Sequence, residues 1–96
     1  MTYTKEKINK YIDTCVNDMI GTVKFTREEI LHRDGAKSAR RWCLGEIKSE
    51  YDRGHGVLLF NLCYMKEITE YEYDEIYERL SEGREKAEEL MWETVK

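Results

Sequence analysis

Val57-Leu-Leu-Phe-Asn-Leu-Cys-Tyr-Met65 is the only run of nearly unbroken apolar residues in this chain of 96 residues. Its one polar position is Asn61, so the run would expose a large apolar patch if it lay on the surface. We therefore expect it to be buried, with the other segments packed around it. A helix over about residues 57–66 is favoured over a strand pair of 22–25 with 57–60, because an isolated strand pair is marginally stable in water.

The composition of the chain is that of a small helical globular domain. Charged residues make up 38% and hydrophobic residues 41%, and there is no proline. Since helix-favouring residues are plentiful, we expect an all-α fold. Single domains run from about 50 to 250 residues. We therefore interpret residues 1–96 as one helical domain, a small bundle of four to five helices around the segment at 57–66.

The sequence carries no pattern typical of secretion or membrane insertion. No apolar signal segment follows the N-terminus, and the longest apolar run is far shorter than the roughly 20 residues that cross a bilayer. Cys15, Cys43 and Cys63 are odd in number and set among apolar residues. We interpret them as buried free thiols in a reducing compartment. These features predict a cytoplasmic protein.

The segments before the apolar run are predicted to be helices. Apolar residues at spacings of three and four predict a helix from about Thr4 to Ile20, with Gly21 as its C-terminal cap. Residues 22–25 would connect it to Thr26-Arg27-Glu28-Glu29. This tetrad matches a capping box and predicts the start of a second helix.

A break in the second helical region is expected near Gly35, because Asp34-Gly35 is a turn signal. Ser38 can then cap a segment that runs to about Arg53, where Gly54-His55-Gly56 would end it. The alternative is one kinked helix over residues 27–53.

A long helix is predicted at the C-terminal end of the sequence. Thr69-Glu70-Tyr71-Glu72 is a second capping box and predicts a helix over about residues 70–94. Gly83 and Ala87 form a smooth patch that another helix can approach closely, so we expect a homodimer through this face. They lie on a heptad seam of Tyr73, Ile76, Leu80, Gly83, Ala87, Leu90 and Thr94.

Charge is unevenly distributed along the chain, whose net charge is −4. Residues 24–55 carry eight positive and six negative side chains, a balance of +2. Residues 56–96 carry five positive and eleven negative ones, a balance of −6. This asymmetry is the first indication of function, since charged surfaces select their partners.

No group of residues indicates catalysis, a metal site or a cofactor. The cysteines contain no C-x-x-C pair, and His32 and His55 lie 23 residues apart, unlike the clustered ligands of a zinc site. Gly54-His55-Gly56 is too short for a phosphate-binding loop and lacks the lysine that would follow it. We expect a protein that is not an enzyme.

Tyrosines and acidic residues are interleaved in the C-terminal region. Tyr64, Tyr71, Tyr73 and Tyr77 fall within 14 residues, and interfaces are enriched in tyrosine, tryptophan and arginine. The alternative is that these tyrosines cover a small core with their hydroxyl groups in water. The candidate partner-binding residues are Tyr71, Tyr73, Tyr77, Asp74, Glu78, Arg40, Arg41 and Trp42.

The stretch from Thr26 to Trp42 has a second interpretation. It opens with Thr-x-x-Glu, contains a glycine at position 35 and ends in Arg-Arg-Trp. In these features it resembles the helix-turn-helix of excisionase-like and MerR-like DNA-binding proteins. The resemblance implies that Lys37, Ser38, Arg40 and Arg41 would face a DNA duplex. The alternative interpretation is that the stretch is a solvated basic helix, which Trp42 anchors to the core.

Taken together, these patterns favour a small protein-binding protein that docks an acidic, tyrosine-bearing helix on a partner. The partner would be a protein, one candidate being a protein with a basic nucleic-acid-binding surface. In size, charge and lack of catalytic residues the chain is similar in style to accessory proteins of phages and mobile elements, including anti-CRISPR inhibitors. The alternatives are a helix-turn-helix DNA-binding regulator and a structural homo-oligomer.

Overall fold

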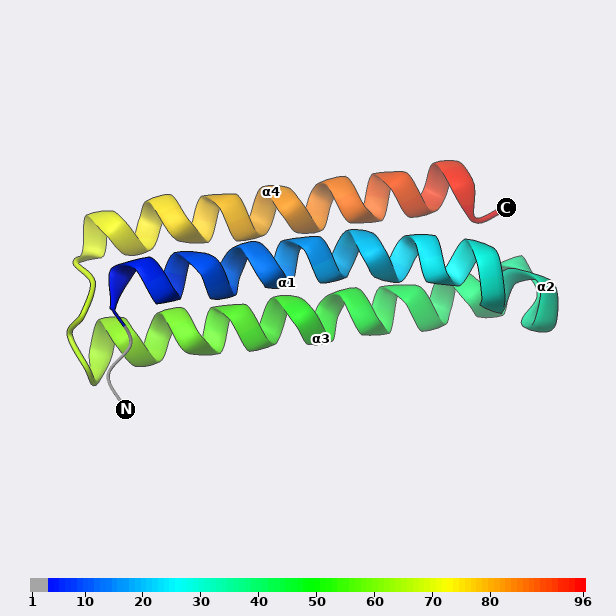
Figure 1. Cartoon of the computed structure of the whole chain (residues 1–96). Coiled ribbons are helices and arrows are strands. Elements are labelled where there is room, and N and C mark those ends of the chain that lie inside the picture. The colour runs from blue at the N-terminus through cyan, green and yellow to red at the C-terminus, as the bar shows by residue number, and fades with distance from the viewer. Residues whose placement is uncertain (1–3) are drawn as a thin grey trace.

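The computed structural model describes residues 4–96, and these form an antiparallel bundle of three long helices (Figure 1). The long helices are α1 (Lys5–Phe25), α3 (Ala36–Cys63) and α4 (Glu70–Thr94). Between α1 and α3 lie a single π-helical segment, η1 (Thr26–Ile30), and a short α2 (Leu31–Asp34). No strand occurs among the described residues. The predicted all-α class is confirmed. The prediction of four to five helices around a central one was wrong, because the bundle has three long helices.

The three long helices lie side by side in a rod of 45 × 22 × 17 Å. α1 and α4 run in the same direction and α3 runs the opposite way (Figure 1). Each contributes one apolar face to a shared core, because residues three and four apart lie on the same side of a helix. The core members are Ile8, Ile12, Cys15, Met19 and Val23 of α1, Ala39, Cys43, Ile47 and Leu58 of α3, and Ile76, Leu80, Ala87 and Met91 of α4.

The first helix begins as predicted but does not end at Gly21. Its N-cap is Thr4, whose hydroxyl accepts a hydrogen bond from the amide of Lys7. The predicted connector at 22–25 is helical, and the capping box at Thr26 was wrong. Thr26 is fully buried and donates its hydroxyl to the carbonyl of Thr22 at 2.7 Å. Since that side chain faces the core within a continuing helix, it does not cap a new one.

The predicted break near Gly35 is confirmed. Gly35 has a φ of +83°, a conformation that residues with a Cβ rarely adopt, and it separates α2 from α3. α3 starts directly afterwards at Ala36, so the predicted cap at Ser38 was wrong. Gly54 does not end the helix either. A Cβ on Gly54 would lie 3.2 Å from both terminal carbons of Leu80, so the glycine lets α3 and α4 approach closely.

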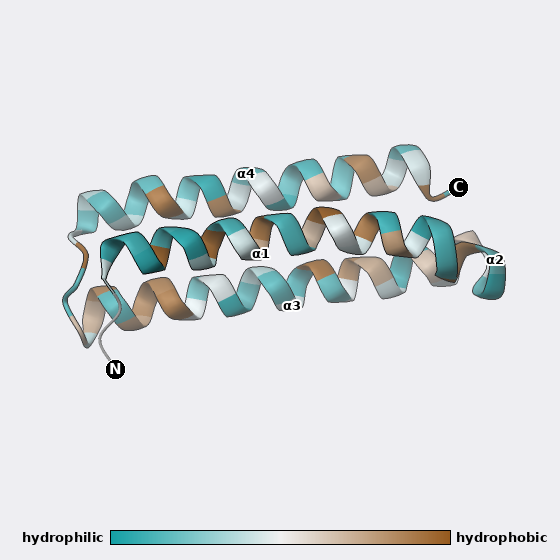
Figure 2. Cartoon of the chain, in the orientation of Figure 1, coloured by the Kyte–Doolittle hydropathy of each residue, from teal (hydrophilic) through white to brown (hydrophobic). Residues whose placement is uncertain are grey.

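The apolar run that begins at Val57 is not the centre of the molecule. It forms the last turns of α3, which ends at Cys63, and these turns are coloured as hydrophobic in Figure 2. Leu58 and Asn61 are buried, whereas Phe60 and Tyr64 are 45% and 79% exposed. A helix in a three-helix bundle buries one face only, so an unbroken apolar run leaves the rest in solvent. Cys63 is also exposed, while Cys15 and Cys43 are buried as expected.

The C-terminal helix matches its prediction at both ends. The hydroxyl of Thr69 accepts from the amide of Glu72, whose carboxylate accepts from the amide of Thr69. The close approach at Gly83 and Ala87 is made by α1 of the same chain, because a Cβ on Gly83 would lie 2.7 Å from the methyl carbons of Val16. The face predicted to form a dimer is therefore already buried. None of the described helices is long and apolar enough to span a bilayer.

Candidate interaction surfaces

Tyr73 and Tyr77 point from α4 toward α3 and form a cluster with two α3 residues. The hydroxyl groups of Tyr51 and Tyr77 are hydrogen-bonded to each other, and Nε2 of His55 lies 2.8 Å from the hydroxyl of Tyr73. The rings of Tyr73 and Tyr77 stack with their centroids 5.7 Å apart. These two tyrosines therefore join α3 to α4, and both are half-buried, so only part of each side chain is accessible to a partner.

The hydroxyl groups of this cluster influence each other's ionisation. Burial raises the pKa of Tyr51, whereas the hydrogen bond between the two hydroxyl groups lowers the pKa of Tyr77. The guanidinium of Arg84 lies 4.7 Å from the centroid of the Tyr51 ring, a cation–π contact that covers the cluster.

The outer face of α4 has a different character. Tyr71 is 73% exposed and lies at its N-terminal end. From there to the end of the helix, every third or fourth residue on this face is an exposed carboxylate. The full set is Asp74, Glu75, Glu78, Glu82, Glu85, Glu89 and Glu93. We call Tyr71 and these seven residues the acidic stripe, and it extends about 33 Å at 1.5 Å per residue.

The carboxylates of the acidic stripe take part in no salt bridge within the described part of the chain. The salt bridges of α4 carboxylates in residues 4–96 involve Glu72 with Lys5 and Glu88 with Arg84, neither of which belongs to the stripe. A hydrogen bond to Glu75 raises the pKa of Tyr71 and holds its ring against the stripe. Like charges four residues apart destabilise a helix by about 0.2–0.5 kcal/mol per pair. The stripe is therefore not explained by the stability of the bundle.

The predicted basic residues lie on the first turns of α3. Lys37, Ser38 and Arg41 are exposed, but Arg40 turns toward α4. Its Nη1 donates to the carbonyl of Val95 at 3.0 Å, and its guanidinium lies 5.3 Å from the centroid of the Trp92 ring. Arg40 thus holds the C-terminal end of α4 against α3. The spacing of residues in the sequence did not indicate this role.

Trp42 does not anchor α3 to the core as predicted. It is 38% exposed and packs on Phe25 of α1 with ring centroids 5.8 Å apart. The resemblance to a helix-turn-helix places Thr26 at a helix start. In the structure that residue lies inside the helical path from α1 to η1.

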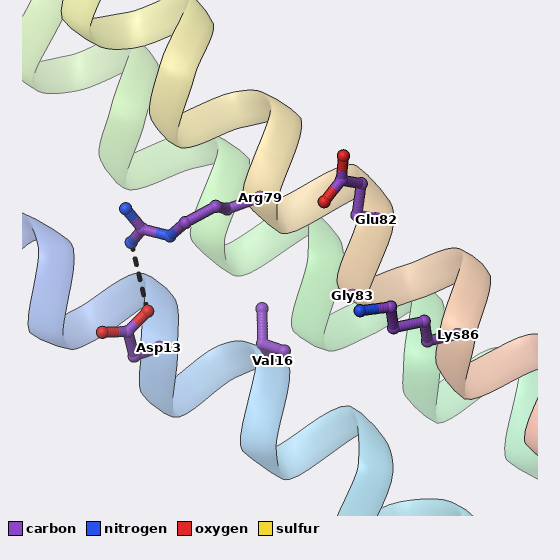
Figure 3. A pocket seen from close by; sticks show the side chains of 6 residues that line it. All are labelled: Asp13, Val16, Arg79, Glu82, Gly83 and Lys86. Atoms are coloured by element: carbon purple, nitrogen blue, oxygen red, sulfur yellow. Dashed lines mark hydrogen bonds and ion pairs between the residues drawn. The ribbon is translucent and has the colours of Figure 1, made fainter.

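A small hollow lies between α1 and α4 beside Gly83 (Figure 3). It measures about 200 Å³ and is lined by Asp13, Val16, Arg79, Glu82, Gly83 and Lys86. Arg79 is occupied there, because its guanidinium donates to Asn9 at 2.8 Å and to Asp13 at 3.1 Å. Two cations balance two carboxylates around the hollow, so it favours neither an anionic nor a cationic ligand.

No group of three or more His, Cys, Asp or Glu side chains among residues 4–96 is placed to hold a metal ion. Comparison with family models, curated proteins and solved structures found no match for this chain. The arrangement of side chains described above is therefore the basis for any functional proposal.

Proposed function

We propose that this protein is a protein-binding protein whose acidic stripe on α4 occupies a basic surface of a partner. The observation that carries the proposal is the row of exposed carboxylates that starts at Tyr71 and takes part in no salt bridge within residues 4–96. Carboxylates on one rigid helix present regularly spaced negative charge, as a nucleic-acid backbone does. A partner surface that normally holds nucleic acid is thus the best match, and occupying it would be inhibitory.

The geometry of the stripe supports steering and specificity. A surface of one charge raises the rate of encounter with an oppositely charged partner and rejects surfaces of like charge. Tyr71 adds a large, exposed ring at one end of the stripe, and such rings are common among the strongest contacts of interfaces. Because the carboxylates sit on a helix packed against both other helices, the backbone needs little ordering on binding, and the remaining cost is that of ordering the side chains.

The test is affinity capture with three forms of the protein at low salt. The first is wild type, and the second carries Asp74→Asn, Glu78→Gln and Glu82→Gln. The third is a matched control that loses one aspartate and two glutamates elsewhere: Asp18→Asn, Glu29→Gln and Glu46→Gln. All six positions are exposed and take part in none of the salt bridges found within residues 4–96.

We expect wild type and the control to retain the same partner, and the stripe variant to lose it. Raising the salt concentration should release the partner, and nucleic acid added in solution should compete for it. Equal retention by the stripe variant would contradict the proposal. Equal loss by the control would show that net charge, rather than the stripe, attracts the partner.

A further inference from the structure

A groove lies on the molecule where the first turns of α3 meet the last turns of α4. It has a volume of about 460 Å³ and is lined by Lys37, Arg40, Arg41, Leu44 and Trp92. We call it the basic groove. The contact between Arg40 and Trp92 and the hydrogen bond from Arg40 to Val95 hold one wall in place. α4 contributes Trp92, and α3 contributes the other four lining residues, including the half-buried Leu44.

The charge of the basic groove is of one sign. Its lining contains three cationic side chains and no carboxylate, and none of the three cations takes part in a salt bridge within residues 4–96. The first turn of α3 contains no acidic residue, and its N-cap Gly35 supplies no side-chain cap. The positive end of the helix dipole therefore adds to the charge of Lys37, the groove cation that lies in this turn.

The apolar part of the basic groove consists of Leu44 and Trp92. Trp92 is 56% exposed although it lies beside Leu44, so an apolar side chain placed between them would cover both. The groove is open along its length, whereas small-molecule sites enclose most of their ligand. A segment of polypeptide lying across the surface fits this shape better than a small molecule does.

The edge of the groove disfavours a nucleic acid. Glu89 and Glu93 are exposed on the turns of α4 that carry Trp92. A nucleic-acid strand carries a phosphate on every nucleotide and would bring negative charge against these carboxylates. A peptide can place a carboxylate in the groove and leave the neighbouring positions neutral.

We infer that the basic groove binds a short acidic and apolar peptide segment of a protein partner. An aliphatic or aromatic side chain packs between Leu44 and Trp92, and an adjacent carboxylate pairs with Lys37 and Arg41. Arg40 positions Trp92 and does not itself need to release Val95. This surface adjoins the end of the acidic stripe but shares no residue with it, so one chain presents two surfaces of opposite charge.

The test is selection of a displayed library of random 12-residue peptides against the whole protein. We expect enrichment of peptides that combine Asp or Glu with Leu, Phe or Trp. An enriched peptide that contains no tryptophan should change the fluorescence of Trp92 in a Trp42→Phe background, where the protein has no other tryptophan. No enrichment, or enrichment of basic peptides, would overturn the inference.

A pair of double variants locates the binding. Lys37→Ala with Arg41→Ala removes two charges from the basic groove, and Lys7→Ala with Lys24→Ala removes two exposed lysine charges elsewhere. We expect the groove variant to weaken the selected peptide at least tenfold and the control by less than twofold, with both variants melting like wild type. Equal affinity in the groove variant, or tighter binding of a six-nucleotide single strand than of the peptide, would overturn the inference.

Discussion

The inner and outer faces of α4 differ in what their side chains contact. Tyr71 and Tyr73 are two residues apart, and two residues turn a helix by about 200°. Tyr73 therefore faces α3 and is hydrogen-bonded to His55, whereas Tyr71 is on the outside with the carboxylates. On the inner face the side chains contact α3, whereas on the outer face they are exposed and Tyr71 is hydrogen-bonded to Glu75. The inner face should control stability and the outer face binding.

Among the variants that test this difference between the two faces, Gly83→Val on the inner face should lose the most stability. Even the first carbon of a side chain there would lie 2.7 Å from the methyl carbons of Val16, so α1 must move away from α4. Overpacking of this kind costs about 1–3 kcal/mol or more. Urea denaturation should show this loss in the free energy of unfolding. The second substitution Val16→Ala should recover part of it, and an unchanged midpoint in Gly83→Val would contradict the described packing.

A smaller effect is expected for Tyr77→Phe, which keeps the ring and removes the hydroxyl group. Tyr51 then loses its hydrogen bond with Tyr77 in a half-buried position. The loss of such a hydrogen bond costs about 0.5–1.5 kcal/mol. Thermal unfolding should show a lower midpoint for Tyr77→Phe than for Tyr71→Phe, because the Tyr71 hydroxyl lies on the exposed face. An equal shift for the two variants would mean that the inner cluster adds no stability.

The smallest effect on stability is expected for the outer face. Glu78→Gln with Glu82→Gln removes two like charges four residues apart. The free energy of unfolding should therefore rise, by less than about 0.5 kcal/mol. Added salt should stabilise wild type more than this variant, since salt screens the repulsion that the variant has lost. A clear destabilisation would indicate internal partners for these carboxylates and would weaken the proposed function.

The helix of α4 could be predicted from sequence because its start signal is local. The Thr69 capping box depends only on residues within one turn, and Thr69 is exposed and free to make it. The same pattern at Thr26 failed because that side chain is buried between helices, and burial is decided by distant residues. The prediction that the run from Val57 is the buried centre was wrong for a related reason. A segment without polar gaps does not indicate which of its faces is buried.

The candidate surfaces could be predicted only in part. Tyr71, Asp74 and Glu78, which were predicted as contacts together with Tyr73 and Tyr77, lie on one exposed face as helical spacing requires. The inward direction of Tyr73 and Tyr77 depends on how α4 is rotated against α3, which spacing does not fix. The basic groove could not be found from sequence, since Trp92 and Leu44 are 48 residues apart and meet only in the folded bundle.

The glycines inside α3 have a consequence for the order in which the bundle assembles. Gly45, Gly54 and Gly56 each lower the helix propensity by about 1 kcal/mol relative to alanine. α3 is the longest helix, yet its glycines and its uncapped start make it the least able to form alone. α1 and α4 each begin at a hydrogen-bonded cap and can form early. We expect α3 to become helical as it docks against them, so the basic groove exists only once folding is complete.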